Sequence, residues 1–166
     1  MILAAASGHA NIVEILLRHG VDRDVRSQEG RTALMVSARS GHEEVMSVLV
    51  QEGAGLDISD CEGRTALSHA VITSQPASAR RLVEAGARLE VLDNSEKSLL
   101  ELSLSHGHLD MLDTLLDCGA EVPDCLLEVA MEMDHPAALT LLLQRQTVPA
   151  VTARTWARAA DSKQFL

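Results

Sequence analysis

The sequence is poor in aromatic residues: its 166 residues include one Trp, one Phe and no Tyr. A cage for a methylated lysine needs several aromatic faces around the cation, and a platform for single-stranded nucleic acid needs aromatic rings in series. Trp156 and Phe165 are too few to build either one. The composition therefore argues against both kinds of recognition site in their usual form.

Basic residues are also scarce, with 14 Lys and Arg against 24 Asp and Glu, which gives a net charge of −10. Such a balance repels phosphate backbones, so we expect no direct binding of nucleic acid. The negative charge is unevenly placed. Residues 98–144 contain nine acidic residues and neither Lys nor Arg, whereas residues 145–166 contain one acidic and four basic residues. The C-terminal half of the chain therefore carries most of the negative charge.

Cysteine pairs with the spacing of a disulfide framework are missing, and so are long apolar runs. The three cysteines, Cys61, Cys118 and Cys125, are odd in number, which fits a reducing compartment. Residues 1–6 have no basic leader, and the longest apolar runs are far too short to cross a membrane. We therefore expect a cytoplasmic protein without a signal peptide and without membrane insertion.

What the sequence does contain is a repeat with a period of 33 residues. A period of this length indicates a supersecondary unit that must stack on its neighbours to bury its apolar face. The positions that recur are Gly20, Gly53, Gly86 and Gly119; Gly8, Gly41 and Gly107; His9, His42 and His108; Arg31-Thr32-Ala33-Leu34 and Arg64-Thr65-Ala66-Leu67; and Leu16, Leu49, Leu82 and Leu115.

The residue types within one period predict two helices joined by a turn. Thr32 can cap the first helix with its hydroxyl group. Gly41 and His42 interrupt the chain before a second helix, in which the apolar residues of 45–49 recur at i, i+3 and i+4. Gly53 can end that helix in a left-handed conformation, and a polar turn leads to the next unit.

These columns resemble the ankyrin repeat, whose pattern runs G-x-T-P-L-H-x-A-A-x-x-G-H, then a second helix and G-A-D. The segments that match are Gly30-Arg31-Thr32-Ala33-Leu34, Gly41-His42, Gly53-Ala54, Gly63-Arg64-Thr65-Ala66-Leu67 and Gly86-Ala87. The resemblance covers residues 1 to about 146. It implies an all-α fold, a solenoid of helix-turn-helix units joined by short β-hairpin fingers.

Both ends of the chain depart from this pattern. We expect about five units in residues 1–146: a truncated first unit, because Met1 falls in the column of Leu34, and a fifth unit with a shortened finger. Residues 147–166 are expected to form a C-terminal capping helix or tail. Their segment Thr155-Trp156-Ala157 resembles the end of the array in TANC/rolling-pebbles scaffolds. That resemblance implies that the chain is a piece of a large cytoplasmic scaffold, located at cell junctions or the postsynaptic density.

The ankyrin resemblance also implies a concave groove, built from the finger tips and the inner helices, that binds a protein or peptide. Residues are assigned to this groove by their place in the repeat. The candidate partner-binding residues are Gln28, Glu29, Arg31, Met35, Arg39, Cys61, Glu62, Arg64, Ile72, Asn94, Ser95, Lys97, Glu101, His106, Glu128 and Glu132. We expect Met35 and Ile72 to be exposed apolar contacts in it.

Charged groove residues suggest a direction for the bound peptide. Arg31, Arg64 and Lys97 form a basic ladder, one residue per unit, and Glu101, Glu128 and Glu132 form an acidic wall. A groove of this kind would orient an extended peptide, with its basic segment toward the fifth unit and its acidic segment toward the fingers. The alternative is that the ladder is only the repeat consensus, because a basic residue before the Thr is common in ankyrin repeats.

The sequence gives little support for catalysis or for metal binding. The recurring histidines occupy the Gly-His position of the repeat, where the imidazole is expected to bind backbone between helices. His106 and His108 lie near Cys118 and Cys125 in sequence, but no CxxC or HxxxH pair is present to hold zinc. The sequence also lacks a G-x-S-x-G nucleophile motif and the glycine-rich phosphate-binding motifs. We therefore expect neither catalysis nor a cofactor or metal.

The sequence thus predicts a non-catalytic protein-interaction module of an intracellular scaffold or adaptor. Two alternatives stay open: a structural spacer that packs against neighbouring domains of the same chain, and a regulatory docking module for an enzyme. Ile2 and Leu3 are also expected to be exposed where a polar cap is usual, so the fragment is expected to self-associate.

Overall fold

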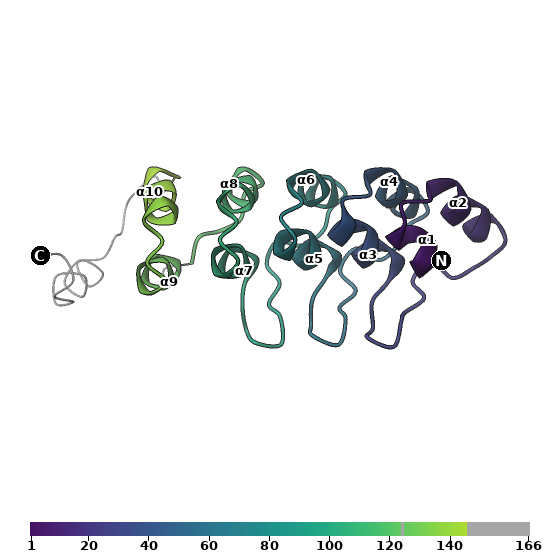
Figure 1. Cartoon of the computed structure of the whole chain (residues 1–166), viewed down its shortest axis with the longest axis horizontal. Helices are drawn as coiled ribbons and strands as arrows, with labels where there is room; N and C mark the ends of the chain where they lie inside the picture. The colour runs from purple at the N-terminus through teal and green to yellow at the C-terminus, as the bar shows by residue number, and fades with distance from the viewer. Residues whose placement is uncertain (124, 146–166) are drawn as a thin grey trace, which may run out of the picture. The chain divides into compact units, whose positions relative to one another are not determined.

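The computed structural model describes residues 1–123 and 125–145 and divides into two compact units, Met1–Val122 and Pro123–Leu166 (Figure 1). Each unit is described by itself. The predicted terminal helix or tail at residues 147–166 lies outside the described residues. In the described part, regular structure is helical apart from one isolated bridge between Leu92 and Ser98, which agrees with the predicted all-α fold.

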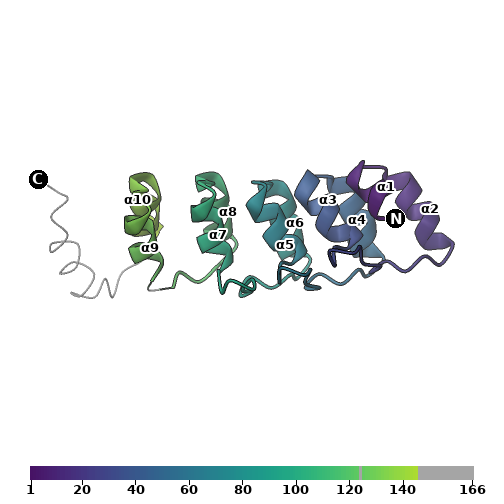
Figure 2. The same cartoon turned by 60° about the horizontal axis from the view of Figure 1, so that its bottom comes forward.

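The first unit consists of helix pairs that repeat with the predicted period. The pairs are α1 (Ile2–Ala6) with α2 (Ala10–Arg18), α3 (Ala33–Ser40) with α4 (Glu43–Gln51), α5 (Ala66–Ile72) with α6 (Pro76–Glu84), and α7 (Leu99–Ser105) with α8 (Leu109–Asp117). The helices α1, α3, α5 and α7 form an inner row, and α2, α4, α6 and α8 form an outer row (Figures 1 and 2). The connections between pairs, called fingers below, project beyond the inner row.

The inner helices begin where the sequence predicts, because a hydroxyl group caps each of them. Thr32, Thr65 and Ser98 have extended backbone, and each side-chain oxygen accepts a hydrogen bond from the backbone N–H three residues later. Gly41 ends α3 in the left-handed region, with φ of 71°, as a glycine can without steric cost. These signals confirm the predicted helix-turn-helix unit.

The core of the first unit is made of apolar columns that run across the repeats. Leu49, Leu82 and Leu115 are fully buried. Leu16, in the same column, is only half-buried, because no described helix pair packs on α1 and α2 from the preceding side. Of the two residues expected to be exposed at this end, Leu3 is exposed and Ile2 is half-buried. Burial in each pair therefore depends on the pair that packs against it.

Hydrogen bonds also join successive pairs. In each of two such bonds, a histidine side chain contacts a backbone carbonyl at the end of the preceding pair's inner helix. The His42 Nε2 atom lies 3.0 Å from the carbonyl oxygen of Ala6, and His108 Nε2 lies 3.1 Å from that of Ile72. Because a carbonyl only accepts, both rings donate through Nε2–H. This confirms the structural role predicted for these two histidines.

The third pair has Gln75 in the histidine position. A different side chain, Thr73, donates the hydrogen bond to the equivalent carbonyl of the preceding inner helix. The Thr73 Oγ1 atom lies 2.8 Å from the carbonyl oxygen of Arg39 and 2.9 Å from that of His69. Arg39 lies one period after Ala6 and one before Ile72, so the carbonyl at each of these three junctions is satisfied.

The fingers are tight turns and not the two-stranded hairpins that the resemblance implied. Across its base each finger has one backbone bond: Ser27 N–H to Arg31 O at 2.9 Å, Asp60 N–H to Arg64 O at 3.0 Å and Asp93 N–H to Lys97 O at 3.1 Å. A second backbone bond, from the residue before the Arg or Lys to the carbonyl of the same Ser or Asp, closes the turn. One bond across the base is too few for a strand. Each finger is named below by the helix pair that follows it, and among the described residues only the fourth-pair finger, which precedes α7, adds the Leu92–Ser98 bridge.

The second unit contains α9 (Leu126–Glu132) and α10 (Pro136–Arg145), which pack against each other. The α9 helix begins after Cys125, which makes no side-chain capping bond, unlike the threonines that cap α3 and α5. The predicted shortened finger of the fifth unit stays a prediction. No helix in the described part of the chain is long and apolar enough to cross a membrane.

The junction bond of Thr73 can be tested by removing its hydroxyl group. We expect Thr73→Val to lower the free energy of unfolding by about 1 kcal/mol, since the Arg39 carbonyl loses its donor from the next pair. The matched control is Thr114→Val, whose hydroxyl donates only within its own helix, to Asp110 O. Urea unfolding followed by circular dichroism measures both, and an equal effect of the two substitutions would contradict the junction role.

Candidate functional site

The predicted groove residues of the first unit lie on the finger tips and on the inner helices, and this surface is called the inner face below. The exposed ones are Gln28, Glu29, Arg39, Cys61, Glu62, Asn94, Ser95, Lys97 and His106; the half-buried ones are Arg31, Arg64, Ile72 and Glu101; and Met35 is buried. Glu128 and Glu132 lie on α9 in the second unit. An acidic wall that joins them to Glu101 therefore stays a prediction.

The expectation that Met35 is an exposed contact is wrong, because its side chain is 1% exposed. Met35 occupies the third position of α3, where its sulfur lies 3.4 Å from the Thr32 backbone nitrogen. Glu101 has the same position in α7, and its Oε2 atom accepts bonds from the Ser98 backbone N–H at 2.7 Å and from the Ser98 hydroxyl at 2.8 Å. Both residues therefore contribute to the helix caps.

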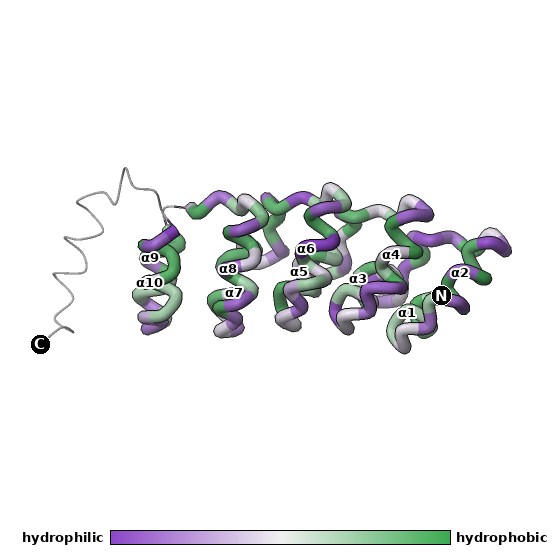
Figure 3. The backbone as a smooth tube through the Cα atoms, turned by 90° about the horizontal axis from the view of Figure 1, so that it is seen from above, coloured by the Kyte–Doolittle hydropathy of each residue, from purple (hydrophilic) through white to green (hydrophobic). Residues whose placement is uncertain are grey.

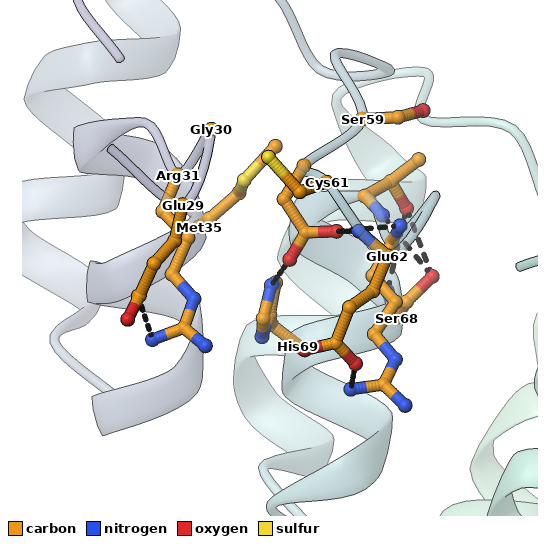
Figure 4. A network of polar contacts seen from close by, with 12 residues as sticks. Glu29, Gly30, Arg31, Met35, Ser59, Cys61, Glu62, Ser68 and His69 are labelled. Carbon is orange, nitrogen blue, oxygen red and sulfur yellow. Dashed lines mark hydrogen bonds and ion pairs between the residues drawn. The ribbon is translucent and has the colours of Figure 1, made fainter. Parts of the chain in front are cut away.

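The basic ladder is partly neutralised by acidic residues of its own fingers. Arg31 forms an ion pair with Glu29 at 2.8 Å, and Arg64 pairs with Glu62 and lies 3.9 Å from the Asp93 carboxylate. Figure 4 shows Arg31 beside Glu29. Arg39 and Lys97 are exposed and form no ion pair with any other described residue. Among the predicted groove residues, the positive charge that forms no ion pair with another described residue is thus on these two side chains.

Neighbouring fingers are tied together through their backbones. The Cys61 N–H donates to Glu29 O at 3.1 Å, and the Asn94 N–H donates to Glu62 O at 3.0 Å. Asn94 adds a side-chain bond from Nδ2 to Cys61 O at 2.9 Å. Gly63 makes this approach possible, because a Cβ atom there would lie 2.8 Å from the Asn94 backbone nitrogen. The finger tips are therefore fixed relative to one another before any partner binds.

A buried Asp–His pair at the base of the third-pair finger was not foreseen from the sequence. The His69 Nε2 atom lies 2.8 Å from Asp60 Oδ2, and both side chains are almost fully buried. The other carboxylate oxygen, Asp60 Oδ1, accepts the backbone N–H groups of Glu62 and Arg64, each at 2.9 Å. The sequence signal was a histidine outside the Gly-His position, nine residues after an aspartate.

The other fingers have the same turn without the histidine. Asp93 Oδ1 accepts the N–H groups of Ser95 and Lys97 at 2.9 and 3.0 Å, and Ser27 Oγ accepts that of Arg31 at 3.1 Å. The positions one period from His69 are Val36 and Leu102. The pair is therefore an addition to one junction and is not required by the repeat itself.

Burial and hydrogen bonding keep Asp60 charged and His69 neutral near pH 7. Burial alone would raise the pKa of Asp60, but the bonds from the Arg64 N–H, His69 and the Glu62 N–H bring it below its usual value. Burial lowers the pKa of His69, and the positive charges of Arg31 and Arg39 lower it further, against the opposing effect of Asp60. A neutral His69 thus donates Nε2–H to the Asp60 carboxylate.

Groups suited to metal binding do not come together in residues 1–123 and 125–145. No group of three or more His, Cys, Asp or Glu side chains there is placed to hold a metal ion. The cysteines are free, and burial raises the pKa of the Cys118 thiol, although Arg80 opposes that shift. Cys118 is therefore protonated at neutral pH and a poor nucleophile.

The depressed pKa of His69 predicts that the protein loses stability as the pH falls below about 6.5, the usual value for histidine, because the unfolded chain then binds the proton more readily. We expect His69→Leu to flatten this loss between pH 7 and pH 5, since Leu102 already fills the equivalent position one period later. Urea unfolding across this pH range measures the effect. The control is His106→Leu, which removes an exposed imidazole, and an unchanged slope in His69→Leu would contradict the account.

Comparison with known proteins agrees with the repeat seen in the sequence and in the structure. A family model described as ankyrin repeats (3 copies) matches residues 1–93, which is more than half of the chain. Among curated proteins, no match was found. The helix pair α7–α8 follows the matched residues and continues the same period.

Proposed function

Because the chain belongs to the ankyrin-repeat family, whose members are generally protein-protein interaction modules, we propose that it binds a segment of a partner protein on its inner face. Domains of this family are typically non-catalytic. The observation that carries the proposal is the combination of Arg39 and Ile72, which lie one period apart near the ends of α3 and α5. Arg39 is a cation that forms no ion pair with another described residue, and Ile72 is a half-buried apolar side chain.

The hydrogen bonds between helix pairs use neither side chain. The backbone carbonyls of Arg39 and Ile72 serve the junction bonds, and those bonds leave both side chains free for a partner. A half-buried isoleucine gives an apolar contact that needs little further ordering. The tied fingers, at the opposite end of the inner helices, also lose little entropy on binding. Lys97, on the fourth-pair finger, provides a second cation that forms no ion pair with another described residue.

These features favour a partner segment with an apolar side chain for Ile72 and acidic groups for Arg39 and Lys97. The charge pattern differs from the predicted basic ladder, because Arg31 and Arg64 already pair with Glu29 and Glu62. A desolvated cation that meets an acidic group of the partner contributes to specificity as well as to the rate of association. We assign the chain to an intracellular scaffold or adaptor, the setting that the resemblance of residues 155–163 to TANC/rolling-pebbles scaffolds favours.

The proposal is tested by comparing partners that the purified chain and an inner-face variant capture from cell lysate. The variant combines Arg39→Glu with Ile72→Asp, and the control places negative charge on the outer helices by Gln51→Asp with Ala77→Asp, both at exposed positions. We expect the inner-face variant to bind the captured partner at least about tenfold more weakly, about 1.4 kcal/mol, and the control to bind it normally. Circular dichroism first confirms equal helicity.

Three outcomes would contradict the proposal. A partner held equally by the wild-type chain and by the inner-face variant would exclude this surface. Loss of binding in the control alone would move the interaction to the outer helices. Failure of the wild-type chain to capture any protein would favour the spacer function.

A further inference from the structure

The junction between the second and third helix pairs is polar at positions where the other junctions of the first unit are mainly apolar. Figure 3 shows these two pairs, α3–α4 and α5–α6, side by side. Three positions of each pair are exposed in the first pair and covered in the later pairs, so they face the preceding pair. From the second pair to the fourth, these positions hold Val36, Val45 and Val48; then His69, Ser78 and Arg81; then Leu102, Met111 and Thr114.

The junction that His69, Ser78 and Arg81 form with the second pair is called the polar junction below. Arg81 forms an ion pair with Glu43 of α4 at 3.3 Å and donates a hydrogen bond to the Ser47 hydroxyl of the same helix. The Ser78 side chain is 1% exposed, and its hydroxyl group has no hydrogen-bond partner in the described part of the chain. A buried hydroxyl without a partner weakens the packing around it. The polar junction therefore depends on polar contacts more than its neighbours do.

His69 makes the polar junction sensitive to acid. Its Nε2–H donates to the Asp60 carboxylate at 2.8 Å, so a second proton would enter at Nδ1. Burial lowers the pKa of His69, and the positive charges of Arg31 and Arg39, both from the second pair and its finger, lower it further, against the opposing effect of Asp60. A protonated His69 would thus place a third positive charge between the two pairs, and it binds that proton more readily once the pairs have separated.

Other charged side chains on the elements around α5 are engaged elsewhere. Glu29, Arg64, Arg80, Arg81 and Glu101 are bonded to other partners, and Glu84 on α6 acts on Cys118. The positions that correspond to His69 at the preceding and following junctions hold Val36 and Leu102, which do not titrate. A fall in pH from 7 to 5 therefore adds charge between helix pairs at the polar junction in particular.

Backbone N–H groups that bond across the junctions provide matched reporters of opening. On the third-pair finger, the Cys61 N–H donates to a carbonyl of the second-pair finger at 3.1 Å, and the Gly55 N–H donates to the Asp24 carboxylate at 2.9 Å. One period later, the N–H groups of Asn94 and Arg88 make the equivalent bonds across the next junction, each at 3.0 Å. The first two groups report on the polar junction and the other two on its neighbour.

We propose that the polar junction is an acid-sensitive joint: when His69 takes up a proton from water, α5–α6 separate from α3–α4 while the neighbouring junction stays closed. The first unit then divides into two blocks, α1–α4 and α5–α8. Arg39 and Ile72 lie on opposite sides of this joint, so its opening changes the spacing between them. That consequence for a bound partner rests on the proposed function, whereas the joint itself does not.

Hydrogen exchange of the purified chain, followed residue by residue by NMR, tests the joint without a partner. We expect the opening constant at the Cys61 and Gly55 N–H groups, corrected for the intrinsic pH dependence of exchange, to rise at least about twofold between pH 7 and pH 5, because an open His69 titrates near its usual value of about 6.5. The constants at Asn94 and Arg88 are expected to stay the same.

Variants at two positions separate the effect of the proton from the effect of packing. We expect His69→Leu to abolish the rise, and the control His106→Leu, which removes an exposed imidazole, to retain it. Ser78→Val, which restores the residue type of Val45 one period earlier, is expected to lower the opening constant at both pH values and to leave the rise in place. If His69→Leu lost helicity, His69→Gln would decide, because glutamine keeps a donor for Asp60 and does not titrate.

Three results would overturn the proposal. The first is an opening constant at Cys61 and Gly55 that does not change with pH. The second is an equal rise at Asn94 and Arg88, which would mean that acid destabilises the whole unit. The third is a rise that persists when His69 is replaced. The experiment uses the chain alone, so its outcome is independent of whether a partner binds at the inner face.

Discussion

The junction between successive helix pairs is the feature on which the rest of the structure depends. No pair can bury its apolar face alone, and the fully buried Leu49, Leu82 and Leu115 lie in pairs that have a preceding neighbour. Each junction also satisfies one carbonyl at the end of an inner helix, through His42, Thr73 or His108. The equivalent carbonyl accepts a hydrogen bond at all three junctions, although the donor residue differs. Satisfying the helix end therefore matters more than which residue donates the bond.

The hydrogen bonds and ion pairs within the fold also determine which polar groups remain available to a partner. The fingers use their backbone to bond to each other, Asp60 and Asp93 close the turns, and Glu101 completes a helix cap. Two of the three ladder cations pair with glutamates of their own fingers. A surface that looks richly charged in sequence therefore presents few uncommitted groups. Those groups lie on a preorganised support, which suits recognition because little conformational freedom is lost when a partner binds.

Much of this architecture could be predicted from the sequence, because period, caps and glycine positions are properties of local residue type. Thr32, Gly41 and His42 act as their types and spacing predicted. The burial of Met35 could not be predicted, since it depends on a side chain turning back into its own cap. The Asp60–His69 pair was also missed, because it depends on a finger folding over a helix that begins later in the chain. The pairing of Arg64 with Glu62 needed the turn geometry of the finger, which the sequence does not contain.

Hydrogen exchange of the chain with and without its captured partner tests most directly whether the inner face carries the interaction. The account predicts that binding slows exchange in the fingers around Cys61 and Asn94 and at the ends of α3 and α5, and leaves α4 and α6 unchanged. Slower exchange confined to the outer helices, with the fingers unaffected, would contradict it.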